Sequence, residues 1–246
     1  MLAWLQTHPF PVEAYFEHSL VLTFAVPKAE LQALLPAPLV VDSFDDDWGF
    51  IAVAMVQTQN LRPQGFPRWL GQDFFLLGYR AFVRYADARG KRLRGLYILR
   101  SETNRRRMSW GGNLFTHYNY HTVDIAQHLT AASLRVQSQQ AGLRVEVQLP
   151  TASAPVPLPP QSPFADWAAA RRFAGPLPFT FSVVGNQVII IEGVREHWQP
   201  QPVAVTEQHV GFFEQLPLSK RVLANAFLVR DIPYSWKKGR SETWQH

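Results

Sequence analysis

Two arginines and one glutamate lie in segments of this chain that otherwise have the composition of apolar strands. Arg80 follows "DFFLLGY" (73–79), and Arg100 and Glu102 belong to "GLYILRSET" (95–103). A guanidinium group stays charged and carries donors that match a carboxylate. Burying such a charge is expensive unless it is paired, so these side chains must find partners or open onto a wet cavity. The pattern favours a small-anion site in which Arg80 and Arg100 supply the charge.

Further candidates follow in "WGGNLFTHYNYH" (110–121). We expect Asn113, His117 and Tyr118 to line the wall of the site, and Glu102 to orient the arginines. If the site is catalytic, Glu102 or His117 is the predicted proton carrier, because both titrate and both are expected in an enclosed space. His117 and His121 are four residues apart, which on the predicted strand separates them too far for one metal ion. We predict no metal site and no cofactor.

Strands must position these side chains. Alternating aromatic and β-branched residues predict strands over 16–26, 48–59, 73–86, 92–103 and 114–128, with a hairpin turn at 87–91. If 96–103 is regular, Leu96, Ile98, Arg100 and Glu102 share one face. Another apolar run, "IIIEGVREHW" (189–198), ends with Glu192 and Arg195, which are of opposite parity unless Gly193 marks a bulge.

Only two segments favour helices: 27–35, and 162–173 with Ser162 as a cap and Pro163 in the first turn. We therefore predict a mainly β (α+β) fold, an antiparallel sheet that curls on itself, with two or more short helices. The proline-rich stretch 151–163 is interpreted as a crossover within one domain spanning residues 1–246.

Composition excludes several classes of protein. The chain has no cysteine, so disulfides and thiolate chemistry are excluded. It contains no G-x-S-x-G, P-loop or G-x-G-x-x-G motif. No apolar window is long enough for a membrane span and the first residues do not resemble a signal peptide, so we expect a cytoplasmic protein without a membrane partner.

The net charge of +5 is concentrated, since nine basic residues fall between Arg84 and Arg107. Such a cluster can attract a phosphate backbone, and nearby aromatic side chains can stack on bases. Strand alternation, however, predicts that these aromatic side chains point into a core, and no nucleic-acid-binding motif accompanies them. We keep nucleic-acid binding through Arg84–Arg107 as the third hypothesis.

Three long segments resemble a known family. They are "LQALLPAPLVVDSFDDDWGFIAVAM", "GYRAFVRYADARGKRLRGLYILRSETN" and "SPFADWAAARRFAGPLPFTF" continuing to "IIIEGVREHW". They resemble domain of unknown function 2071, a family related to acetoacetate decarboxylase, from about Tyr15 to Trp236. The resemblance implies a large antiparallel, partly open β-barrel or cone, acetoacetate-decarboxylase-like, whose conical interior holds a small ligand.

The resemblance does not extend to the decarboxylase's catalytic groups. Its paired lysines, one of which forms a Schiff base, correspond to Thr116 and His117 here. Its arginine corresponds to Gln32, and an acidic position is occupied by Leu76. All five lysines of this chain (28, 91, 220, 237 and 238) lie elsewhere.

Two hypotheses share the cavity. The first is a barrel that binds a small organic acid or similar anion and lacks a Schiff-base lysine. The second is a regulatory or binding module that releases its ligand unchanged. The sequence leaves open whether a reaction is catalysed and whether the chain forms a homo-oligomer.

Overall fold

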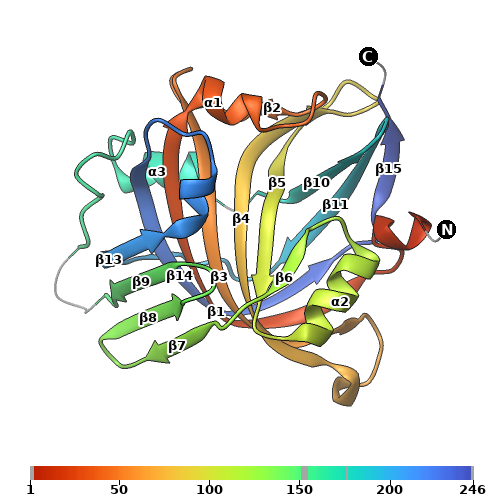
Figure 1. Cartoon of the computed structure of the whole chain (residues 1–246), viewed down its shortest axis with the longest axis horizontal. Coiled ribbons are helices and arrows are strands. Elements are labelled where there is room, and N and C mark those ends of the chain that lie inside the picture. The colour runs from red at the N-terminus through yellow and green to blue at the C-terminus, as the bar shows by residue number, and fades with distance from the viewer. Residues whose placement is uncertain (1–2, 151–154, 176, 245–246) are drawn as a thin grey trace.

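The computed structural model describes residues 3–150, 155–175 and 177–244, and in them the chain forms two β-sheets (Figure 1). The larger sheet is built on long strands, because alternating side chains can bury one face against each of two cores. Its strands, in spatial order, are β12 (Gln201–Pro202), β14 (Val222–Trp236), β1 (Val12–Pro27), β3 (Trp48–Pro63), β4 (Gln72–Ala86), β5 (Arg92–Thr103), β10 (Phe179–Val184), β11 (Gln187–Arg195) and β15 (Arg240–Thr243). The short strands β2 (Val40–Val41) and β6 (Tyr120–Thr122) pair with β4 and β5.

The large sheet curls until β11 meets β14. Gly193–Arg195 pair with Tyr234–Trp236, which closes the barrel at one end only. The predicted mainly β, partly open barrel is thus confirmed. Most pairings are antiparallel, but β5 pairs with both β10 and β6 in parallel, an arrangement that hairpin-by-hairpin reading of the sequence cannot reveal.

The second sheet covers the outside of the first. It consists of β13 (Ala204–Val210), β9 (Leu143–Gln148), β8 (Ser133–Ser138) and β7 (Ala126–Leu129). Its buried side chains, such as Leu134 and Val145, pack in one apolar cluster with Leu77 and Val53 of the barrel wall. One face of β3 and β4 is therefore buried between the two sheets, and the other faces the barrel interior.

Aromatic rings fill one end of the interior. Phe50 stacks on Phe164, with ring centroids 5.3 Å apart, and Phe173 of α3 (Trp167–Phe173) lies 5.1 Å from Phe50. These rings belong to a second apolar cluster that includes Ala52, Ala54 and other interior residues. The interior also contains a cavity, lined by Ala52, Ala54 and Phe82 among others.

The helices agree with prediction in part. α1 (Lys28–Ala33) lies within the predicted 27–35. α3 begins later than predicted, because the Asp166 side chain accepts the Ala169 N–H at 2.7 Å and caps the helix in place of Ser162. Residues 151–154 of the predicted crossover lie outside the described residues. The structure also has short 3₁₀ turns at Ala3–Thr7, Arg68–Leu70 and Gly211–Gln215.

The predicted strand over 114–128 is wrong. Residues Arg106–Phe115 form a helix, α2, and the rest of the segment contains only β6 and β7. Gly111 and Gly112 concealed the helix, since paired glycines ordinarily indicate a turn. Gly112 is needed where it is because a Cβ there would lie 2.4 Å from the Tyr120 ring.

Candidate functional site

Arg80 of β4 and Arg195 at the end of β11 line the same cavity inside the barrel. We call this cavity the arginine chamber; it has a volume of about 110 Å³, and its polar lining residues include Arg80, Tyr118, Tyr120, Thr180, Arg195 and Tyr234. A single water needs only about 10–15 Å³ of such volume, so the chamber has room for a small molecule.

Among the described residues, neither arginine has an acidic partner. In the part of the chain that the structure describes, no carboxylate forms an ion pair with Arg80 or Arg195. The Nε atom of Arg80 and the indole N–H of Trp198, which also lines the chamber, are buried without a hydrogen-bond partner among those residues. Buried donors are normally satisfied, so the chamber has unmet capacity for an acceptor.

The charges of Arg80 and Arg195 repel each other. Burial lowers the pKa of Arg195, and the charge of Arg80 lowers it further, whereas Tyr234 acts in the opposite direction. The Arg195 guanidinium lies 5.1 Å from the centroid of the Trp198 ring and 5.9 Å from that of Tyr234, a cation–π arrangement that holds the side chain toward the chamber. An anion between the two guanidinium groups would remove their mutual repulsion.

The tyrosines in the chamber are hydrogen-bond donors at neutral pH. Burial raises the pKa of Tyr118 and raises the pKa of Tyr120 to about 12, so both phenols keep their protons. Among the residues that the structure describes, no aspartate, glutamate, histidine or lysine lines the arginine chamber. The chamber therefore offers donors and positive charge, and its lining residues lack a side chain that ordinarily titrates near pH 7.

Two glycines make room for these groups. The Arg80 guanidinium lies across Gly78, where a Cβ would be 3.0 Å from Nε and 3.3 Å from an Nη atom. A Cβ at Gly193 would lie 2.1 Å from the Tyr234 hydroxyl oxygen. Strand glycines of this kind mark a close approach by another group.

Arg100 does not join Arg80, and the expectation that they converge is wrong. On β5, Arg100 pairs with Tyr79, but Ile98 pairs with Arg80, so Leu99 is an extra residue in a β-bulge. The bulge reverses the parity of the strand. Leu96 and Ile98 face the arginine chamber, whereas Arg100 lies on the outer face of the barrel wall, beside the turn Gly211–Gln215 that follows β13.

On that outer face Arg100 and Glu102 form a partly buried polar cluster. The Arg100 Nε atom is 2.9 Å from Glu102 Oε1, Arg100 Nη1 donates to Gln215 at 3.2 Å, and the Tyr79 hydroxyl donates to Glu102 Oε2 at 3.2 Å. Burial raises the pKa of the Glu102 carboxyl although Arg100 opposes the rise. Glu102 is thus partnered, and it does not line the arginine chamber.

Of the other residues expected in the site, one lines the arginine chamber and two do not. Tyr118 lines the chamber as expected. Asn113 instead joins α2 to β6, because its amide donates to the Tyr120 carbonyl at 2.9 Å and accepts the Tyr120 N–H at 2.7 Å. His117 is half-buried outside the chamber, and burial lowers its pKa. The structure therefore brings together Arg80 and Tyr118, and it separates Asn113, His117, Arg100 and Glu102 from them.

Sequence reasoning missed Arg195 as a partner of Arg80. Its signal was an arginine at the end of a continuous apolar strand, the same pattern that singled out Arg100. Deciding between the two required the bulge at Leu99 and the pairing of β11 with β14, and neither is encoded in local alternation.

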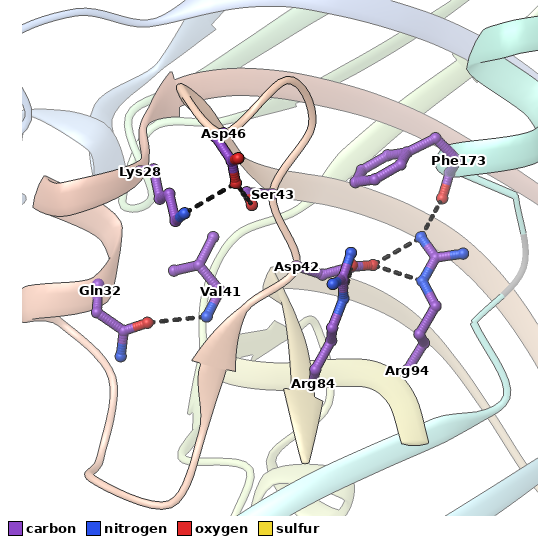
Figure 2. A network of polar contacts seen from close by, with 9 residues as sticks. All are labelled: Lys28, Gln32, Val41, Asp42, Ser43, Asp46, Arg84, Arg94 and Phe173. Carbon is purple, nitrogen blue, oxygen red and sulfur yellow. Dashed lines mark hydrogen bonds and ion pairs between the residues drawn. The ribbon is translucent and has the colours of Figure 1, made fainter. Parts of the chain in front are cut away.

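Part of the arginine-rich segment has a structural role, shown in Figure 2. Arg84 and Arg94 both form ion pairs with the fully buried carboxylate of Asp42; Arg94 Nη2 lies 2.6 Å from Asp42 Oδ2 and also donates to the Phe173 carbonyl at 2.9 Å. The network ties β4 and β5 to α3. Beside it, Gln32 bonds to the Val41 N–H at 2.9 Å and orders the same loop (Figure 2).

The described residues contain no group of three side chains suited to hold a metal ion. Over the same residues, no helix has the length and apolar character needed to cross a membrane.

Comparison with known proteins assigns the family. A family model for domain of unknown function 2071, described as an uncharacterized conserved protein, matches residues 13–233. The chain belongs to this family. No curated protein matches it significantly in sequence.

Solved structures with the same fold are acetoacetate decarboxylases and similar enzymes. The decarboxylase of Legionella pneumophila aligns with a TM-score of 0.64 at 12% identity, covering 96% of this chain and 88% of that one. An acetoacetate decarboxylase-like enzyme from Sphingomonas wittichii aligns with a TM-score of 0.52 at 12% identity, covering 96% of this chain and 92% of that one. The enduracididine biosynthesis enzyme MppR, solved with pyruvate, aligns with a TM-score of 0.56 at 10% identity, covering 95% of this chain and 90% of that one. At these identities the likeness establishes that this member of the 2071 family has the decarboxylase-like fold.

Proposed function

We propose that this protein binds a small organic acid in the arginine chamber, with the carboxylate held between Arg80 and Arg195. One observation carries the proposal: two guanidinium groups line one cavity inside the barrel and have no carboxylate partner among the described residues. Buried charges are ordinarily paired, so a ligand anion is the natural counterion. The pyruvate complex of MppR, a structure of the same fold, is in keeping with this ligand class.

The lining favours binding without Schiff-base chemistry. Neither the arginine chamber nor the apolar cavity beside it is lined by a lysine, among the residues that the structure describes. The lysines have other places: Lys28 pairs with Asp46, Lys237 pairs with Glu192, and Lys220 lies over the Trp48 ring. We propose that the protein lacks a Schiff-base lysine.

The second hypothesis, a module without turnover, has its own support. General acid–base catalysis needs a group whose pKa lies near the working pH. Burial keeps the pKa values of Tyr118 and Tyr120, which line the arginine chamber, well above neutral pH. The ligand, on this proposal a cytoplasmic metabolite, would be released unchanged, and mass spectrometry of acids recovered after incubation tests this directly.

The binding test compares three matched arginine variants. Calorimetry with pyruvate and butyrate should show binding to the unaltered protein, and Arg80→Gln or Arg195→Gln should weaken it about tenfold or more, since each removes a charge-assisted hydrogen bond. Arg100→Gln is the control, because it removes an arginine from the opposite face of the same wall. Equal affinity in all three variants, or a loss confined to Arg100→Gln, would overturn the proposal; circular dichroism confirms that each variant is folded.

Nucleic-acid binding is not favoured by any contact. Of the nine basic residues between Arg84 and Arg107, Arg84 and Arg94 are committed to Asp42 and Arg100 to Glu102. The segment is thus only partly a free cationic surface.

A further inference from the structure

A second cavity adjoins the arginine chamber. It has a volume of about 190 Å³ and lies between α2, the segment 8–12 and the ends of β3 and β4. We call it the apolar chamber, because its lining is dominated by Phe16, Phe74, Leu76, Met108, Phe115 and Trp236. Two charged residues, Arg62 and Arg107, also line it, and Arg62 is already paired with Glu13, with Nη2 2.6 Å from Oε1. The apolar chamber thus offers surface for hydrocarbon.

The two chambers share a wall. Phe16, Leu76, Tyr118, Tyr120 and Trp236 each line both of them. Leu76 lies four residues before Arg80 on the same face of β4, with Gly78 between them. The apolar chamber therefore lies next to a molecule bound at the guanidinium groups, and the side chains that line both cavities stand at the boundary between them.

We propose that the two chambers bind one ligand, a monocarboxylate with an unbranched apolar chain or an aryl group, whose head lies between Arg80 and Arg195 and whose body occupies the apolar chamber. This inference rests on the proposed function and names its substrate class. A short polar acid would fill only the arginine chamber and leave the apolar one without a role.

Helix α2 provides a way to test the occupant. Arg107, Met108, Gly111, Gly112 and Phe115 line the apolar chamber, a spacing that places them on one helical face. A Cβ built at Gly111 meets no atom within 4 Å, so a larger side chain there enters open space. Gly111→Leu should fill the apolar chamber and also favour the helix. The neighbouring Trp110 is 73% exposed, and Trp110→Leu is the matched control.

The experiment measures dissociation constants of butyrate, hexanoate, octanoate and decanoate, with 1-octanol as the uncharged probe. In the unaltered protein and in Trp110→Leu, each added methylene should tighten binding about fourfold until the chamber is full. In Gly111→Leu, butyrate should bind as before while the gain with chain length disappears. Octanol should bind more weakly than octanoate, and Arg80→Gln should weaken the acids but not octanol.

The outcomes separate the two claims. Butyrate binding that depends on Arg80 without any gain from butyrate to decanoate would overturn the amphipathic ligand and leave the proposed function standing. Octanol binding as tightly as octanoate would also overturn it, since the apolar chamber would then be an independent site. No binding of any acid would overturn the proposed function itself.

Discussion

Arg80 and Arg195 come from strands that are distant in sequence, and burial makes their shared chamber electrostatically costly in the absence of an anion. Burial and the neighbouring Arg80 charge already lower the pKa of Arg195. Sites built for binding commonly reduce stability in this way. The cost should be measurable at the level of a single side chain.

We expect Arg80→Gln to raise the free energy of unfolding of the ligand-free protein by about 1 kcal/mol, because it removes one of two partly buried cations that have no carboxylate partner among the described residues. Urea denaturation of the ligand-free variant measures this. A variant that is instead less stable would mean that Arg80 is satisfied in the free protein.

His18 makes stability depend on pH. Its side chain is 3% exposed and its Nε2 atom lies 2.9 Å from Gln127 Oε1, and burial lowers its pKa. A base whose pKa is lowered on folding is protonated first in the unfolded chain, so its contribution is complete above pH 6.5 and is lost as the pH falls below that value. Glu17 and Arg230 also act on this ring, in opposite directions.

We therefore expect the free energy of unfolding to fall below pH 6.5 by up to about 1.4 kcal/mol per pH unit from His18 alone. His8 and His117 act in the same direction, whereas the raised pKa of Glu102 acts in the opposite one. The difference between the unaltered protein and His18→Gln, measured from pH 5 to 8, isolates the His18 contribution. A pH-independent difference would contradict it.

At the scale of elements, local irregularities decide which face a side chain occupies. The bulge at Leu99 sends Arg100 and Glu102 to the outer face, and Gly112 lets α2 approach the Tyr120 ring. The Asp42 network has a comparable role, since one buried carboxylate joins strands β4 and β5 to the end of α3.

Asp42→Asn should destabilise the protein by about 2 kcal/mol, less than the loss of a wholly buried pair, because Arg84 and Arg94 are more than a third exposed and regain water. Asp46→Asn is the control, as its carboxylate is 92% exposed and its bond to Lys28 is 3.2 Å long; its effect should be near zero. Thermal unfolding compares the two, and equal effects would show that the network adds no stability.

At the scale of the whole molecule, alternation of residue types predicted a sheet that curls on itself, and the family resemblance implied the partly open barrel. Alternation identified β1, β3, β4 and β5, the turn at 87–91, and Arg80 as an interior cation. Alternation could not predict the partner of Arg80, because that depends on a one-residue bulge and on the meeting of β11 with β14. The glycine pair in α2 misled the prediction of a turn followed by a strand over 114–128 for a similar reason, since Gly112 is there to allow a tertiary contact with Tyr120.

We propose that residues 1–246 form one domain. Leu134 and Val145 of the second sheet share an apolar cluster with Val53 and Leu77 of the barrel, so neither sheet buries its apolar face alone. A single cooperative transition is expected, with coincident midpoints by far-ultraviolet circular dichroism and calorimetry. Two separated transitions would contradict a single domain.

The central claim is that Arg80 and Arg195 together hold a carboxylate. It is tested most directly by a crystal structure with 4-bromobutyrate, in which anomalous scattering locates the bromine independently of the carboxylate. The account predicts the carboxylate within hydrogen-bonding distance of both guanidinium groups, with the bromine directed toward Leu76. Guanidinium groups turned away from an ordered ligand, or a ligand bound outside the barrel, would contradict it.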